Sequence, residues 1–108
     1  MPKPSWNEYA VMLADLYRGE IDFLIDRGHE SVEISWRGSS NTAIRASTAD
    51  GFLLATNACG SSELANATRA REPWFLCRYR GADGDAPVIL GQGSSADFAI
   101  AYRQAMGL

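Results

Sequence analysis

Three short strand-like segments follow one another in the first half of the chain, and they limit the possible fold more than any other feature. In the first segment Val32, Ile34 and Trp36 alternate with polar residues, which is typical of a strand with one buried face. The second segment is rich in β-branched residues, and Asp50-Gly51 forms a typical hairpin turn before the third. Strands joined by such short turns pair antiparallel. We therefore predict an antiparallel meander over residues 31–37, 42–48 and 52–56.

The segment before these strands predicts one continuous amphipathic helix over residues 6–27. Its apolar residues recur at helical spacing and share one face, whereas the opposite face is rich in acids. Gly28 follows as a natural helix end. The apolar face consists of Trp6, Tyr9, Ala10, Leu13, Tyr17, Ile21 and Leu24.

The second half of the chain predicts a helix, two strands and a final helix. A Gly-Ser-Ser triplet at 60–62 favours the start of a short helix that Pro73 ends, strands are expected over 74–80 and 87–90, and Ser94 is expected to open the last helix. The predicted order is α-β-β-β-α-β-β-α. We expect a single α+β domain over residues 1–108, with an antiparallel sheet of about five strands and three helices.

Charge is distributed unevenly along the chain. The formal net charge is −3, but residues 34–82 hold six bases and three acids, and nine of the ten bases of the chain are arginine. Arginine pairs bidentately with carboxylates and phosphates. The arginines could therefore face an anionic partner, or the acidic helix of the same molecule.

The amino-terminal residues show no apolar leader, and no apolar run is long enough to span a bilayer. We therefore expect a cytoplasmic protein with no membrane partner. In that reducing compartment Cys59 and Cys77 are expected to be free thiols, and they lack the spacing of a zinc or redox motif.

Two constellations could carry chemistry, and each has a simpler interpretation. The segment Gly91–Ser95 resembles a dinucleotide-binding turn before a helix, but no strand or acidic residue follows to complete such a site. A generic anion site at this turn stays open. Cys59 could be activated by His29, although we expect His29 at the surface beside a helix end. We therefore expect no cofactor, no metal and no enzymatic activity.

The remaining surface indicates binding. Helices on one face of the sheet would leave the other face in need of cover, and its arginine and aromatic side chains are typical of protein interfaces. We predict a small protein-binding module (a chaperone, inhibitor or regulatory adaptor) that forms a homodimer. The alternative is a nucleic-acid-binding regulator, because bases stack on aromatic rings between arginines. The candidate partner-binding residues are Arg37, Arg45, Trp74, Arg78, Tyr79 and Arg80.

The predicted element order, the small acidic chain and the amphipathic last helix resemble the class I type III secretion chaperones. The resemblance lies in architecture and composition, with no residue motif to carry over. It implies a dimeric, non-enzymatic protein that holds an extended segment of another protein along its surface.

Overall fold

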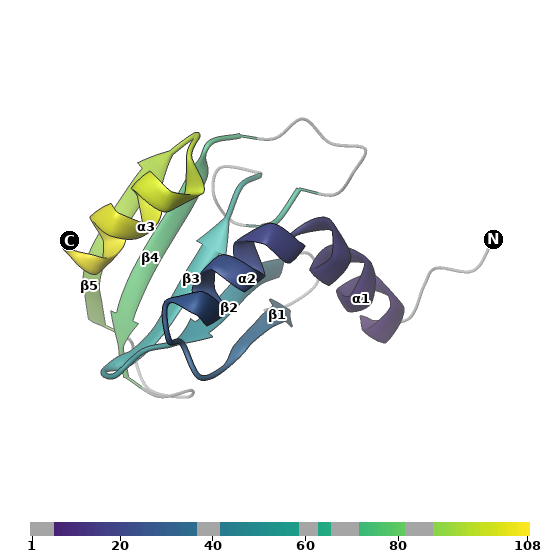
Figure 1. Ribbon diagram of the computed structural model, residues 1–108, viewed down its shortest axis with the longest axis horizontal. Helices are drawn as coiled ribbons and strands as arrows, with labels where there is room; N and C mark the ends of the chain where they lie inside the picture. The colour runs from purple at the N-terminus through teal and green to yellow at the C-terminus, as the bar shows by residue number, and fades with distance from the viewer. Residues whose placement is uncertain (1–5, 37–41, 59–62, 66–71, 82–87) are drawn as a thin grey trace.

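The structure is a computed structural model that describes residues 6–36, 42–58, 63–65, 72–81 and 88–108 (Figure 1). It confirms the α+β class, with a five-stranded antiparallel sheet and three helices. The described elements run α-α-β-β-β-β-β-α rather than in the predicted order. They are α1 (Trp6–Leu16), α2 (Arg18–Asp26), β1 (Val32–Trp36), β2 (Thr42–Ser47), β3 (Gly51–Thr56), β4 (Trp74–Arg80), β5 (Val88–Ser95) and α3 (Phe98–Met106).

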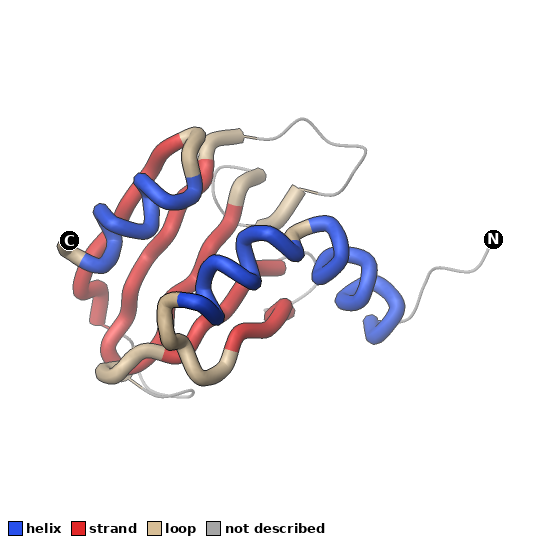
Figure 2. The backbone as a smooth tube through the Cα atoms, viewed as in Figure 1, coloured by secondary structure: helices blue, strands red, loops and turns tan. Residues whose placement is uncertain are grey.

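The sheet is a meander in which each strand pairs with the next one along the chain. Its order is β1-β2-β3-β4-β5, and all four pairings are antiparallel. Figure 2 shows the strands of this sheet in red and the helices in blue. The strands β1 and β5 consequently form the two edges. In antiparallel sheets every second residue of an edge strand turns its N–H and C=O groups outward, away from the neighbouring strand.

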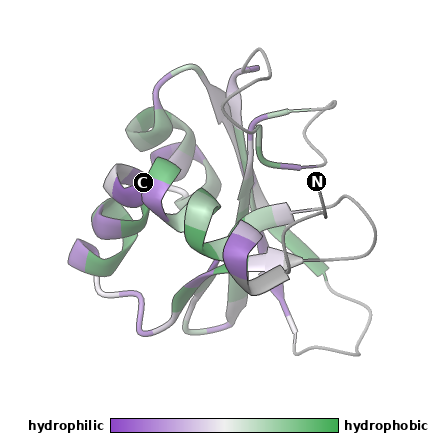
Figure 3. Ribbon diagram, turned by 90° about the vertical axis from the view of Figure 1, so that its right-hand side faces the viewer, coloured by the Kyte–Doolittle hydropathy of each residue, from purple (hydrophilic) through white to green (hydrophobic). Residues whose placement is uncertain are grey.

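All three helices pack on the same face of the sheet, in front of it in Figure 1, and Figure 3 shows this layer from the side. Leu13 of α1, Leu24 of α2 and Ala101 of α3 are fully buried in one core cluster. The sheet contributes alternate residues to this core, as a strand with one covered face requires. These sheet residues are Ile44, Ala46, Leu53, Ala55, Trp74 and Leu76. No helix in the described part of the chain is long and apolar enough to cross a bilayer.

The predicted helix over 6–27 is divided at Tyr17, so its continuity was wrong, although its predicted apolar face from Tyr9 to Leu24 is buried or partly buried. Tyr17 is fully buried, and its backbone (φ −108°, ψ 27°) departs from helical geometry. Its hydroxyl donates a hydrogen bond to the Ala65 carbonyl, and its ring meets Trp74 edge-on at 5.5 Å. These contacts fix Tyr17 against the sheet, and the helix axis changes direction there (Figure 1). Gly28, with φ at +93°, ends the second segment as predicted.

The helix predicted to follow residues 60–62 is absent from the described residues 63–65. Glu63 instead forms an isolated antiparallel bridge with Ala58. The Leu64 N–H bonds the Thr42 carbonyl at 2.9 Å, and the Ala65 N–H bonds Asn57 Oδ1 at 2.7 Å. The N–H groups of Leu64 and Ala65 are therefore bonded to a strand carbonyl and to a side chain, and not to the carbonyls of a preceding helical turn. The remainder of the predicted helix, with residues 59–62 and 66–71, lies outside the described residues.

The Gly91–Ser95 segment is a strand rather than a turn, so the predicted turn is wrong, and the anion site that the sequence left open does not have the turn on which it depended. These residues pair with β4, and α3 begins later, where Asp97 accepts a hydrogen bond from the Ala99 N–H at 2.9 Å. The glycines serve packing instead. A Cβ atom on Gly93 would lie 2.8 Å from the Cβ of Gln104, too close for real atoms, so glycine allows α3 to rest on the β5 backbone.

Candidate protein-binding surface

A row of side chains crosses the face of the sheet that the helices leave uncovered. One residue from each strand contributes, and we call Glu33, Arg45, Phe52, Tyr79 and Ile89 the cross-sheet row. The strand registers place Glu33 opposite Arg45, Phe52 opposite Tyr79, and Tyr79 opposite Ile89. The sequence placed Arg45 and Tyr79 in a binding surface, and the structure does bring them onto one face.

The members of the cross-sheet row stack on one another. The Arg45 guanidinium lies 4.0 Å from a Glu33 carboxylate oxygen and 4.7 Å from the centre of the Phe52 ring. Phe52 and Tyr79 stack with ring centres 5.0 Å apart and planes inclined by 24°. The ion pair contributes little because the Glu33 side chain is 59% exposed. Phe52, the middle residue of the row, is buried, so packing holds its ring in place.

A β-bulge puts Ile89 at the β5 end of this row. The register between β4 and β5 shifts between Arg78 and Tyr79, so that Arg78 faces Gly91 whereas Tyr79 faces Ile89. Such an extra residue reverses the alternation of side chains beyond it. Ile89 is thereby turned to the helix-free face beside Tyr79, and it is 53% exposed.

The neighbouring residue points to the other face of the sheet and is exposed as well. Val88 pairs with Arg80 in the β4–β5 register and is 48% exposed. Two adjacent apolar residues of one edge strand are thus half-exposed on opposite faces. We call Val88 and Ile89 the edge pair.

The other predicted partner-binding residues lie apart from this surface. Trp74 belongs to the core, edge-on to Tyr17 and Phe98, so it is not available to a partner. Arg78 lies on the helix side, where its Nε donates to the Ala105 carbonyl at 3.2 Å. Arg80 is exposed at the end of β4, and Arg37 lies outside the described residues. These residues do not form one surface, because alternate residues of β4 face opposite sides of the sheet.

The nucleic-acid alternative depends on the aromatic residues of β4. Single-stranded nucleic acid needs exposed aromatic faces on which bases can stack. Of the aromatic residues in β4, Trp74 is in the core, Phe75 is partly buried, and Tyr79 has one face against Phe52. No specific observation on the described residues favours this function.

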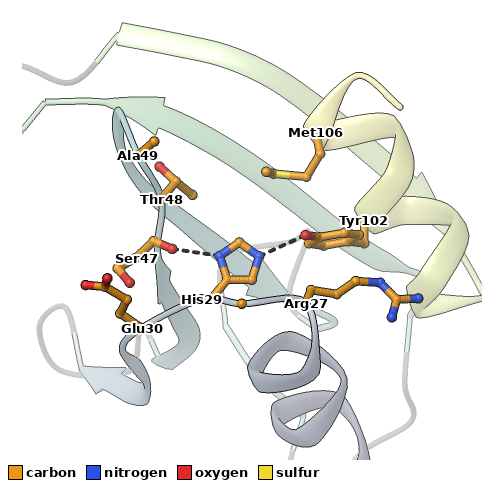
Figure 4. A pocket seen from close by; sticks show the side chains of 9 residues that line it. Arg27, His29, Glu30, Ser47, Thr48, Ala49, Tyr102 and Met106 are labelled. Carbon is orange, nitrogen blue, oxygen red and sulfur yellow. Dashed lines mark hydrogen bonds between the residues drawn. The ribbon is translucent and has the colours of Figure 1, made fainter.

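A cleft of about 530 Å³ opens at the far end of the helix layer, between the end of α2, the β2–β3 turn and α3 (Figure 4). His29 crosses it, with Nδ1 2.7 Å from the Ser47 carbonyl oxygen and Nε2 2.9 Å from the Tyr102 hydroxyl. A carbonyl only accepts, so Nδ1 carries a proton and Nε2 of the neutral ring accepts from Tyr102. The predicted surface position of His29 was wrong, because the ring is partly buried between two partners.

Tyr102 is the buried partner in this contact. Burial raises the pKa of its hydroxyl, and the positive charge of Arg27 opposes part of that shift. His29 thus ties the start of β1 to the end of β2 and to α3. Of the two cysteines, Cys77 is a free, buried thiol and Cys59 lies outside the described residues, so the weighed Cys59–His29 pair has no described geometry.

Sequence reasoning missed the edge pair. Val88 and Ile89 were assigned to a strand, but nothing in their local pattern reveals that this strand would be an edge. The apolar run Val88-Ile89-Leu90 is also typical of a fully covered strand. The uncharged composition of residues 88–95 was the available signal, but only residues 87–90 were predicted as a strand and Gly91–Ser95 was interpreted as a turn.

The chain matches no protein-family model, and neither a curated protein nor a solved structure matches it significantly.

Proposed function

We propose that this protein is a non-enzymatic protein-binding module, of the chaperone, inhibitor or adaptor kind, that docks an extended segment of its partner beside β5 as a sixth strand. The edge pair carries this proposal. A ligand on one face of the sheet would cover Ile89 or Val88, but not both, because the two side chains point to opposite faces. A segment lying alongside the edge covers both and also pairs with the outward backbone groups.

The composition of β5 supports the same docking mode. Edge strands are usually protected from added strands by charged residues, proline or short length. None of the eight residues of β5 is charged or proline. Main-chain hydrogen bonds would supply affinity for any extended segment, and Val88 and Ile89 would select one with apolar side chains.

The contacts in the His29 cleft support the non-enzymatic part of the proposal. The Ser47 and Thr48 hydroxyls accept hydrogen bonds from the backbone N–H groups of Ser31 and Gly51. His29 bonds the carbonyl of Ser47 rather than its hydroxyl. The imidazole therefore holds three parts of the fold together, whereas a catalytic base would face a nucleophile.

Affinity capture from the native host with matched variants tests the proposal. Ile89→Lys adds a charge to the docking edge, and Ile100→Lys makes the same change on α3 at a residue of similar exposure, 47% against 53%. We expect the wild-type and Ile100→Lys proteins to retain one stoichiometric partner, and Ile89→Lys to bind it at least about tenfold more weakly. Thermal melts check that both variants fold. Capture by Ile89→Lys that equals wild-type capture would overturn the docking site.

A further inference from the structure

We infer that Gln104 of α3 blocks the carboxyl-terminal part of the β5 edge. A docked segment is then confined to Val88–Gln92, and a second copy of this chain cannot pair along the whole strand. The inference rests on the proposed function, since it presumes that β5 is the docking edge. It adds which part of the edge is used and what kind of partner fits.

A side chain already stands where an added strand would bind. The Ser94 N–H donates to Gln104 Oε1 at 2.9 Å, although Ser94 lies opposite Phe75 in the β4–β5 ladder. This N–H therefore points away from β4, toward the free side of the edge. The amide oxygen of Gln104 takes the place that a backbone carbonyl of a sixth strand would occupy.

The glycines of β5 explain why a helix side chain can reach this position. Gly93 leaves no Cβ between the strand and α3, and the Cβ of Gln104 lies directly above it. From there the glutamine side chain spans the short distance to the neighbouring N–H. A larger residue at position 93 would lift α3 and withdraw the amide from the edge.

The open part of the edge coincides with the edge pair. Outward backbone groups alternate along an antiparallel edge, so Gln92 presents its N–H and C=O outward as Ser94 does. The stretch from Val88 to Gln92 contains both half-exposed apolar residues, and the hydrogen bond of the Gln104 side chain to β5 lies outside it, at Ser94. A short extended segment can pair there without disturbing Gln104.

A second copy does not fit the edge in the same way. Symmetric antiparallel pairing about the middle of β5 would place the Ser94 end of each copy opposite the Val88 end of the other. Both Ser94–Gln104 hydrogen bonds would have to break. Pairing of two copies along the whole strand is therefore disfavoured, and the occupant that we infer is a short apolar segment of a different protein, which needs only Val88–Gln92.

Sedimentation velocity over a concentration series tests this inference with the whole protein. Gln104→Ala removes the amide, whereas Gln104→Glu keeps a side-chain oxygen that can accept from Ser94. We expect wild type and Gln104→Glu to remain monomeric. Gln104→Ala should self-associate about 30-fold more tightly, since each copy no longer loses a hydrogen bond on pairing. Adding Ile89→Lys to Gln104→Ala should reverse the association, and amide hydrogen exchange should show faster exchange at Ser94 in monomeric Gln104→Ala.

Three results would overturn the inference. One is a wild-type dimer that Ile89→Lys dissociates, which would leave β5 as a docking edge but remove the role of Gln104. Another is a Gln104→Ala protein that stays monomeric at every concentration. The third is unchanged protection of the Ser94 amide in Gln104→Ala. The proposed function is tested separately in the affinity-capture experiment, where it fails if Ile89→Lys captures the partner as well as the wild type does.

Discussion

The two edge strands of this sheet are built in different ways. β1 has five residues and includes Glu33, and it meets the helices through the side chains of Val32 and Ile34, which pack against the core. β5 has eight uncharged residues and meets α3 through its backbone at Gly91 and Gly93. β1 is therefore held by ordinary side-chain packing and carries a charge that discourages pairing. β5 is held by close backbone contact and leaves apolar side chains at its rim.

This difference separates a structural edge from a docking edge. Packing through side chains makes the sequence of β1 alternate, with apolar residues inward. Because β5 contacts α3 at its glycines, its other residues need not alternate between apolar and polar. Val88 and Ile89 can therefore be exposed at the edge of the sheet. The comparison can be tested by changing the contact of each edge strand with the helices.

The largest effect is expected for Gly93→Ala in β5. The new Cβ would collide with the Ala101 carbonyl and with Gln104, and α3 would have to shift away from β5 to relieve the collision. We expect a loss of about 3 kcal/mol in the free energy of unfolding, measured by urea denaturation. The control is Gly19→Ala in α2, where a Cβ meets nothing within 4 Å. It should gain about 0.5–1 kcal/mol, because alanine favours the helix. Equal effects at the two glycines would refute the close-contact description of β5.

A smaller effect is expected from a change of one methylene group in β1. Ile34 packs against the core from the edge strand and is partly buried. Ile34→Val should lower the free energy of unfolding by about 0.5–1 kcal/mol, since the surrounding side chains can partly relax. Adding one carbon to β5 should thus cost more than removing one from β1. Denaturation curves of the two variants side by side give the ratio, and a larger loss at Ile34 would contradict it.

The smallest effect is expected from ionisation of Tyr102, which links α3 to His29 just before β1. Burial raises the pKa of this hydroxyl in the folded state. The unfolded chain therefore releases the proton first, from about pH 10, and stability falls as pH rises through that range. Below about pH 10 this contribution is fully present. Tyr102→Phe should flatten the alkaline decrease in melting temperature, and an unchanged pH profile would show that Tyr102 does not cause it.

The sequence predicted those parts of the fold whose side chains face one core. Leu13, Tyr17 and Leu24 recur at helical spacing and are fully buried, and the meander from Val32 onward follows from alternation and the Asp50-Gly51 turn. These features are local, because each residue's environment follows from its neighbours in sequence.

The sequence failed where a distant contact decides the structure. Gly91-Gln92-Gly93-Ser94-Ser95 has the composition of a turn, but it pairs with β4 as a strand, and its glycines let α3 approach closely. Tyr17 breaks a helix that its periodicity favours, because Ala65 accepts its hydroxyl from 48 residues away. The candidate site depends on strand order, so Trp74 and Tyr79 of one strand were predicted together although they face opposite sides.

Amide hydrogen exchange on the captured complex tests the docking edge most directly. One experiment can compare an outward N–H group on each edge strand, that of Gln92 on β5 and that of Ile34 on β1. The Ser31 carbonyl accepts from the Ser47 N–H of β2, so backbone groups alternate from there and the Ile34 N–H points away from β2. Strand addition at β5 predicts that the partner slows exchange at Gln92 and leaves Ile34 unchanged. Unchanged exchange at Gln92 in a saturated complex would contradict it.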